Sequence, residues 1–508
     1  MLSKVLSGTT VGLEAIPITV EVDISSKSLP TFTIVGLPSK AVEESKERVR
    51  AALKNSGAEF PQHRITVNLA PADIPKEGPS YDLPIALGIL IASGQIPSSI
   101  DNMLVYGELS LDGSLRHTKG ILPLALLVKE KKLKGLFIPD VNAKEASIVE
   151  GVDIYPVKSV IDLFHHATDR IPISVYPHTP FSKITKEAFA EFDFADIKGQ
   201  EQAKRAFEIS AAGGHNVSMT GVPGAGKTML ARALPGILPD LTENEALEVT
   251  KIYSVTGNIP HGSSIIKVRP FRSPHHTTSR IGLIGGGAHP VPGEISLSHR
   301  GILFLDEFPE FPRHVLEALR QPVEDGIVSI SRAAGTVSYP AKFMLIVASN
   351  PCPCGYFGDE VRPCRCPPSA IDRYRKRVSG PIIDRIDIHL HLPPVKVDKL
   401  TTDKTTSETS QKVKKRVQKA RDIQTRRFRS SPIVCNADMN SKNVRKYCPI
   451  SEESSKLLKS AVSTLHLSAR SYFKMIKLAR TIADLNQEDI IAPEHIAEAL
   501  QYRPKNEI

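Results

Sequence analysis

The chain has 508 residues, of which 41% are hydrophobic and 24% charged, so we expect two to four folded domains rather than a disordered protein. The formal net charge of +10 favours an anionic partner, but nucleotide, nucleic acid and lipid headgroups all qualify. The longest apolar run, Leu83 to Ser93, is too short to cross a bilayer, and residues 1–20 lack the apolar stretch of a secretion signal. We therefore expect a cytoplasmic protein without membrane contact.

Short apolar runs alternate with helical patterns in the first third of the chain, which predicts an α/β domain over residues 1–165. The predicted helices are Ser39 to Ser56, Asp82 to Ser93 and Gly120 to Lys132, and the predicted strands are Arg64 to Leu69, Leu104 to Leu109 and Gly135 to Ile138. A proline-rich stretch then predicts an exposed linker over residues 166–191. A second α/β pattern covers residues 192–395.

A glycine-rich motif in this second region follows a predicted strand, Asn216 to Thr220, and opens a predicted helix, Met229 to Leu234. The motif fits the P-loop pattern and consists of Gly221, Val222, Pro223, Gly224, Ala225, Gly226, Lys227 and Thr228. Backbone N–H groups of such a loop converge on phosphate oxygens, Lys227 reaches the β and γ phosphates, and the Thr228 hydroxyl meets Mg²⁺. The motif predicts ATP and Mg²⁺ as ligands, and a chance glycine-rich turn is the alternative.

Two further polar groups follow apolar strands. Asp306 and Glu307 end the run Ile302 to Leu305, which is typical of a buried parallel strand. Beside a P-loop, Asp306 would hold Mg²⁺ and Glu307 would polarise the attacking water, whereas a surface acidic pair is the alternative. Asn350 follows the predicted strand Phe343 to Ala348 and would orient that water, unless it is only a turn residue before a proline.

These residues resemble the AAA+ family, and more closely its ComM/YifB branch, called magnesium-chelatase-like, which is similar to magnesium chelatase subunit I and MCM helicases. Besides the P-loop and the ILFLDE strand, the matching segments are RSPHH, PVPGEISL, SNPCPCG, SGPIIDRID and LSARSYFKMIKLARTIADL. The resemblance implies a Lon-protease-type α/β domain, an AAA+ core with a parallel sheet, a basic linker or helix at 396–430, and a C-terminal helical lid at 431–508.

The resemblance also implies roles for three polar residues. Asn350 would be sensor 1, Arg385 an arginine finger that reaches the γ-phosphate of a neighbouring subunit, and Arg470 sensor 2. Hydrolysis would then depend on assembly of a homo-oligomer, expected to be a hexamer. Without the resemblance, we would expect Arg385 to form a local ion pair with a neighbouring aspartate, and Arg470 to be an exposed helix residue. The finger role could also fall to Arg373, Arg375 or Arg377.

Four of the six cysteines lie close together in the core, as an insertion at residues 351–367. They are Cys352, Cys354, Cys364 and Cys366. Four thiolates can close a tetrahedral Zn²⁺ site, so we expect structural zinc, with buried reduced thiols or a redox disulfide as alternatives. The paired histidines His275 and His276 have no matching ligand set, so we assign them no metal.

Other segments are interpreted through the same resemblance. Residues 265–297 resemble loops that project into the pore of the ring, and Ser329 to Tyr339 resembles a hairpin whose Arg332 is a candidate for contact with a phosphate backbone. In the N-terminal domain, the segment around Ser80 resembles the loop that carries the nucleophile of Lon, but Leu122 stands where the catalytic lysine belongs. Lys119 lies one helical turn away and is an alternative base, but its position on the helix changes the direction of its side chain. We therefore expect no proteolysis and a role in assembly or DNA binding.

Between Lys399 and Arg429 there are eleven lysines and arginines against three acids, which gives about +8 in one segment. Such a segment neutralises phosphates without reading sequence, although a solvated linker is the alternative. We expect a ring-forming ATPase that translocates on branched or single-stranded DNA, as in branch migration during recombination or natural transformation. The alternative is a protein-remodelling ATPase that resembles magnesium chelatase subunit I.

Overall fold

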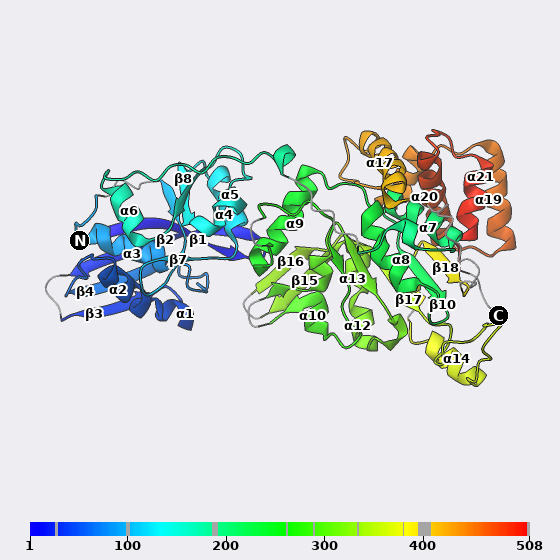
Figure 1. Cartoon of the computed structure of the whole chain (residues 1–508), viewed down its shortest axis with the longest axis horizontal. Helices are drawn as coiled ribbons and strands as arrows, with labels where there is room; N and C mark the ends of the chain where they lie inside the picture. Colours follow the sequence, from blue (N-terminus) through cyan, green and yellow to red (C-terminus); the bar gives the residue numbers. More distant parts are fainter. Residues whose placement is uncertain are drawn as a thin grey trace. The chain divides into compact units, whose positions relative to one another are not determined.

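The computed structural model describes residues 1–25, 29–97, 102–184, 191–260, 263–287, 290–332, 335–378, 380–394 and 408–504 (Figure 1). Parts of the predicted linker (185–190) and of the predicted basic segment (395–407) lie outside these residues. The chain forms two compact units. The first comprises Met1–Thr185 and Glu243–Ile266, and the second comprises Lys186–Thr242 and Lys267–Ile508. No helix among the described residues is long and apolar enough to span a membrane.

A seven-stranded mixed sheet forms the first unit, in the order β3-β4-β2-β1-β5-β8-β9. The strands are β1 (Leu2–Val11), β2 (Glu14–Ser25), β3 (Thr31–Val35), β4 (Arg64–Ala70), β5 (Met103–Val105), β8 (Gly135–Pro139) and β9 (Asp153–Val157). The helices include α1 (Lys40–Glu43), α2 (Ser45–Asn55), α3 (Asp82–Ala92), α4 (Ile121–Glu130) and α6 (Val160–Ala167). The predicted elements are confirmed with two exceptions. The single helix expected over residues 39–56 is divided at Glu44, and the single strand expected over Leu104 to Leu109 is divided into β5 and a short strand β6 (Glu108–Leu109) of a separate two-stranded sheet.

The long antiparallel pair of β1 and β2 is absent from the sequence-based prediction. Its alternation is obscured because β1 turns small hydroxyl residues inward, and Ser3, Ser7 and Thr9 are all buried. Ser3 Oγ donates to the carbonyl of Gly88 in α3 at 2.7 Å. An added Cβ on Gly88 would lie 2.6 Å from Val22, so the helix packs closely on the sheet. Buried hydroxyl residues therefore obscure the pattern of β1, whereas β2 buries apolar residues at alternate positions and was not identified despite this pattern.

Helix α9 (Glu243–Thr256) belongs to the first unit, although its residues fall within the region that the sequence analysis assigned to the second α/β domain. The hydroxyl of Ser254 donates to Glu145 at 2.6 Å, and the backbone N–H of Gly120 donates to the Ser254 carbonyl at 3.0 Å. Burial raises the pKa of Glu145, which the Ser254 hydrogen bond opposes. These contacts fix α9 beside α4, so the chain passes between the two units more than once.

A five-stranded sheet forms the centre of the second unit, in the order β11-β14-β17-β10-β18. Each neighbouring pair is parallel. The strands are β10 (Val217–Gly221), β11 (Phe271–Arg272), β14 (Ile302–Leu305), β17 (Met344–Ser349) and β18 (Ile388–Leu392). The earliest of these strands in the chain, β10, therefore lies between the last two, β17 and β18. Where the strand order reverses in this way, loops at the carboxyl ends separate and leave room for a ligand.

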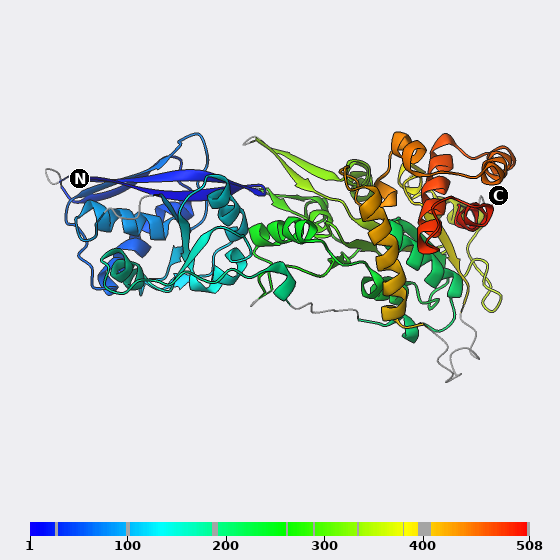
Figure 2. The ribbon, with the colours of Figure 1, turned by 90° about the horizontal axis from the view of Figure 1, so that it is seen from above.

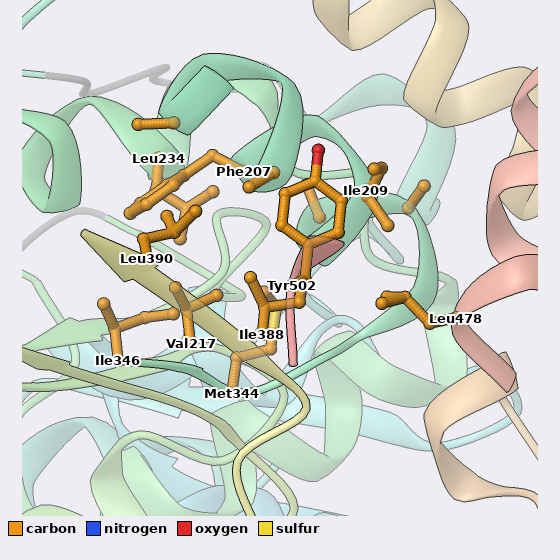
Figure 3. Packing of buried hydrophobic residues seen from close by; sticks show 14 of the residues in the cluster. Phe207, Ile209, Val217, Leu234, Met344, Ile346, Ile388, Leu390, Leu478 and Tyr502 are labelled. Atoms are coloured by element: carbon orange, nitrogen blue, oxygen red, sulfur yellow. The ribbon is translucent and has the colours of Figure 1, made fainter. Parts of the chain in front are cut away.

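Apolar side chains of this sheet pack against helix α7 (Glu201–Gly213) and the C-terminal helices. Figure 3 shows Val217 and Ile346 of the sheet beside Ile388 and Leu390, with Phe207 of α7 over them. The C-terminal helices are α17 (Ser410–Arg427), α18 (Ser441–Tyr447), α19 (Glu452–Thr464), α20 (Ala469–Leu485) and α21 (Pro493–Gln501). The last three agree with the helices that the sequence pattern predicts over Glu452 to Leu465, Ala469 to Leu485 and Pro493 to Tyr502. Figure 2 shows α17 alongside α20.

A two-stranded hairpin, β15 (Ile327–Arg332) and β16 (Gly335–Pro340), occupies the predicted position before β17. Figure 2 shows it as a yellow-green ribbon that extends from the body of the second unit. Arg332 ends β15, but its side chain lies outside the described residues. The structure therefore confirms the hairpin and leaves the phosphate contact of Arg332 a prediction.

A half-buried histidine of β18, His389, should make the stability of the protein depend on pH. Burial, and then the charge of Lys474, lower the pKa of His389 from 6.5 to about 4. Between these values the unfolded chain binds a proton that the folded chain does not, so stability falls as the pH drops from 6.5 toward 4. The upper bound of this loss is about 3 kcal/mol. We expect His389→Gln to unfold with a weaker pH dependence across this range.

The measurement is urea unfolding of the full chain at a series of pH values from 7.5 to 4.5. His63→Gln, which changes an exposed histidine of the first unit, is the matched control and should follow the parent protein. Parallel pH profiles for His389→Gln and the parent protein would show that His389 does not contribute.

Candidate functional site

The carboxyl ends of β14, β17 and β10 lie side by side and carry the predicted site residues. In the parallel register Thr220 is opposite Ser349, and Leu305 is opposite Val347. The Thr220 and Ser349 hydroxyls also lie 3.2 Å apart. The P-loop after β10, the acidic pair after β14 and Asn350 after β17 therefore meet at one edge of the sheet.

Glycines of the loop after β10 allow its unusual backbone path. Gly224 and Gly226 have φ values of +81° and +87°, and a Cβ at either position would meet nothing within 4 Å. The backbone conformation, rather than lack of space, is therefore what requires glycine there. Gly226 is the N-cap of α8 (Lys227–Ala233), so the loop leads directly into the helix N-terminus. This geometry presents backbone N–H groups and the positive end of the helix dipole on one side.

The Lys227 ammonium lies inside the loop. Its Nζ donates to the carbonyls of Gly221 at 2.6 Å and Val222 at 3.1 Å, and to Asn350 Oδ1 at 3.1 Å. Burial lowers the pKa of Lys227, and the nearby Asp306 carboxylate opposes this shift. The lysine predicted to bind phosphate and the asparagine predicted to orient water are therefore in direct contact.

Oxygen ligands suited to Mg²⁺ also come together. The hydroxyl of Thr228 donates to Asp306 Oδ2 at 2.8 Å. A hydroxyl and a carboxylate are the hard oxygen donors that Mg²⁺ takes from protein, and the ion usually keeps several waters. Thr228 of the P-loop and Asp306 of the acidic pair, the two residues predicted to hold Mg²⁺, are thus adjacent and of the right chemistry.

Glu307 begins a short helical turn in a left-handed conformation, with φ of +50°. Its side chain is 55% exposed, and its Oε2 lies 3.2 Å from Nδ1 of His276. The His276 ring also lies against His275, with 4.1 Å between ring centroids. The sequence analysis considered this histidine pair only as a metal site and did not predict its contact with the acidic residue. Only the proximity of the strands β11 and β14 brings the two segments together.

Arg385 and Arg470 meet at a third residue, Glu324 of helix α13 (Arg320–Asp325). Arg385 makes a direct ion pair with Glu324, and its Nη1 donates to the Pro381 carbonyl at 2.5 Å. Arg470 Nη2 lies 4.0 Å from Glu324. Burial, followed by the charge of Arg470, lowers the pKa of Arg385. Neither arginine contacts residues 221–228 among the described interactions, so the structure groups them with each other and not with the P-loop of the same chain.

The four clustered cysteines converge after β17. Their sulfur atoms all lie within 4.8 Å of one another, and three pairs are 3.4 to 3.6 Å apart. These separations are too long for a disulfide, whereas four thiolates around Zn²⁺ would lie roughly 3.8 Å apart. The cluster is therefore compatible with a structural zinc ion.

A cavity of about 260 Å³ lies beside the P-loop and was not predicted. Its lining comprises residues 199–203 at the start of α7 and residues 390–394 at the end of β18. Gln200 Nε2 donates to the Pro393 carbonyl at 2.7 Å and to the Ala225 carbonyl at 3.4 Å. One glutamine thus connects the cavity to the phosphate-binding loop.

Some cations of the predicted basic segment make contacts inside the second unit instead of facing solvent. Arg416 pairs with Glu208 and Glu408, and Arg421 is buried and bonded to backbone carbonyls of α7. The exposed cations of α17 are Lys412, Lys415, Lys419 and Arg426. The helix is therefore a packed element of the fold that has one basic face.

The N-terminal segment expected to carry a broken protease dyad lies in the first unit. Leu122, which stands where a catalytic lysine belongs, is fully buried. Its backbone N–H donates to Glu145 and to Ser254. A lysine side chain at this position would face the core.

Three family models match the chain. They are described as magnesium chelatase, subunit ChlI, over residues 193–400, subunit ChlI of Mg-chelatase over residues 20–142, and magnesium chelatase, subunit ChlI C-terminal, over residues 407–503. The matches include the P-loop, the acidic pair and Asn350 in a single family domain.

Similar proteins extend the match to nearly the whole chain. Competence protein ComM of Haemophilus influenzae is 43% identical over 511 residues, which cover 99% of this chain and 97% of that protein. The YifB protein of Escherichia coli is 42% identical over 508 residues, with the same coverage. The magnesium-chelatase 38 kDa subunit of Rhodobacter capsulatus is 27% identical over 179 residues, which cover 32% of this chain and 50% of that protein. The chain therefore belongs to the ComM/YifB family of magnesium-chelatase-like AAA+ ATPases.

Proposed function

We propose that this protein is a ring-forming ATPase that couples ATP hydrolysis to movement along DNA. The observation that carries the ATPase part is the convergence of the P-loop, the Thr228–Asp306 pair and Asn350 at adjacent strand ends. Lys227 would bind the β and γ phosphates, and Glu307 would polarise the attacking water. Thr228 and Asp306 would hold Mg²⁺, which neutralises charge on the phosphate oxygens when bound.

The cavity beside Gln200 suits the base of the nucleotide. It is next to the phosphate loop, its volume of about 260 Å³ accommodates a purine, and backbone groups at 199–203 and 390–394 can bind the ring edge. Gln200 donates a hydrogen bond to the Ala225 carbonyl, so a base bound in this cavity would affect the position of the P-loop. Base and phosphates would then lie on either side of β10.

Assembly into a ring, expected to be a hexamer, would complete the site. Arg385 and Arg470 share Glu324 and do not contact the P-loop of their own chain, which supports their action on the nucleotide of a neighbouring subunit. A guanidinium supplied in this way stabilises charge on the transferred phosphoryl group. The C-terminal helices, which carry Arg470, would serve as the lid, and the Lon-type N-terminal domain as an interaction module without protease activity.

Support for DNA as the track comes from the family and from charge. The chain matches competence protein ComM over nearly its full length, and α17 presents Lys412, Lys415 and Lys419 on its exposed face. Such cations bind phosphates without reading sequence, which suits translocation. The hairpin β15–β16 is a second candidate contact. A protein client is the alternative, because the Rhodobacter magnesium-chelatase subunit shares the family domain.

ATP hydrolysis should increase when DNA is present. We expect forked or four-way-junction DNA to stimulate hydrolysis several-fold at about 50 mM salt and much less at about 200 mM, because phosphate contacts release counterions. Lys227→Ala should abolish hydrolysis with and without DNA. The measurement is phosphate release by the purified full chain. A rate that DNA leaves unchanged, together with unchanged assembly, would exclude the DNA motor and favour a protein client.

Arg385 should act between subunits. We expect Arg385→Ala and Lys227→Ala to be inactive alone, and an equal mixture to recover up to about a quarter of the parent rate, since only some interfaces then combine an intact loop with an intact arginine. Arg445→Ala, which changes an exposed arginine of α18 with no proposed role, is the matched control and should keep the parent rate. If mixed rings form, as judged by size, but recover no activity, Arg385 is not an arginine finger.

The cysteine cluster should hold zinc. We expect about one Zn²⁺ per chain in the purified protein, and its loss in the double variant Cys364→Ser/Cys366→Ser, because two thiolates cannot close a tetrahedral site. Metal analysis after gel filtration measures this content. Cys435→Ser, which changes a buried cysteine outside the cluster, should retain the metal. Parent protein free of zinc would contradict the assignment.

A further inference from the structure

The cysteine segment is attached at both ends to Asn350. Cys352, whose side chain is fully buried, comes two residues after Asn350. Beyond the last cysteine the chain enters helix α14 (Pro368–Arg375), where the Tyr374 hydroxyl accepts a hydrogen bond from the backbone N–H of Asn350. The insertion is therefore a closed loop whose two ends meet at the residue that contacts Lys227.

The same segment also lies on the phosphate-binding loop. Gly355 has a φ of +88°, and a Cβ there would be 2.7 Å from Cγ of Pro223 and 4.0 Å from Cγ of Asn350. Its backbone N–H donates to the Cys352 carbonyl at 3.0 Å. Gly355 therefore ends the turn that begins at Cys352 and lies directly against Pro223 of the P-loop. There is no space for a side chain at this position.

Contacts of two aromatic side chains hold this segment besides its cysteines: the Arg375 guanidinium of α14 lies 5.1 Å from the centre of the Phe357 ring, and Arg362 donates to the Tyr356 hydroxyl at 3.0 Å. Most of its residues from Cys354 to Cys366 are half-buried or exposed, and its sequence is rich in proline, glycine and charge. The four sulfur atoms, all within 4.8 Å of one another, bring the two arms together at the turn beside Pro223. A metal ion bound there would fix the turn that contacts Pro223, whereas separated thiols would leave that turn free to move.

We propose that the cysteine cluster positions the phosphate-binding loop and Asn350, so that metal bound by the four thiolates sets the affinity for nucleotide. Gly355 and Tyr374 are the positioning residues that transmit this effect. The inference rests on the proposed ATP binding and adds a structural dependence to it. Loss of the metal would weaken nucleotide binding even though no cysteine touches the nucleotide.

Two glycines of the same segment provide a matched test. Gly358 has a φ of +80°, similar to that of Gly355, but a Cβ there would meet nothing within 4 Å. Gly355→Ala and Gly358→Ala therefore impose similar backbone strain, and only the first disturbs the contact with Pro223. We expect Gly355→Ala to weaken binding of a fluorescent ATP analogue about tenfold, and Gly358→Ala to change it less than about twofold.

A zinc-selective chelator, used with excess Mg²⁺, tests the metal directly. It should weaken binding of the same analogue to the parent protein about tenfold and have little further effect on Gly355→Ala, because the contact is already disturbed. Metal content is measured on every sample. Removal of zinc without any change in affinity, or equal affinities of the two glycine variants, would overturn the inference. Parent protein that does not bind the analogue would instead refute the proposed ATPase site.

Discussion

The position of β10 between β17 and β18 is the constraint on which the site depends. A parallel sheet that is covered on both faces needs continuous apolar strands, and Ile302 to Leu305 of β14 are all fully buried. In β14 and β17 the polar groups accordingly lie only where the strands end. Parallel strands end at the same edge of the sheet. The strand order therefore brings Lys227, Asp306 and Asn350 together, and the three loops need no further contacts to do so.

A buried polar network connects this sheet to the C-terminal helices. Asp387, which precedes β18, accepts a hydrogen bond from His215, and the other ring nitrogen of His215 lies 2.8 Å from the Thr481 hydroxyl of α20. Burial alone would raise the pKa of Asp387, but the hydrogen bond and charge of His215 lower it to about 2. Removing one partner would leave a buried group unpaired, which is strongly destabilising. The network therefore fixes α20, and with it Arg470, relative to Arg385.

Sequence patterns predicted the elements whose burial follows a simple period. The P-loop strand and helix, β14, β17 and the last three helices all have one apolar face or a continuous apolar run. Strand β1 was not predicted because Ser3 and Ser7 occupy its buried face, whereas β2 was missed although its apolar residues alternate regularly. The docking of α9 and the contact between His276 and Glu307 could not be predicted either, since both join segments through tertiary packing. The basic segment was identified by charge, but its pattern did not reveal that Arg416 and Arg421 are used inside the fold.

If the protein acts as the proposed ring, the distribution of cations would make a single chain a poor catalyst. Transfer of a phosphoryl group spreads negative charge over oxygens that need several positive groups nearby. In this chain Lys227 is the cation in contact with the P-loop carbonyls and Asn350, while Arg385 and Arg470 are held together at Glu324. Two like charges this close are tolerated because Glu324 lies between them, and a neighbouring γ-phosphate would compete with that carboxylate for both. In the proposed ring, Glu324 would therefore keep the two arginines ready when no nucleotide is opposite them, and release them when one arrives.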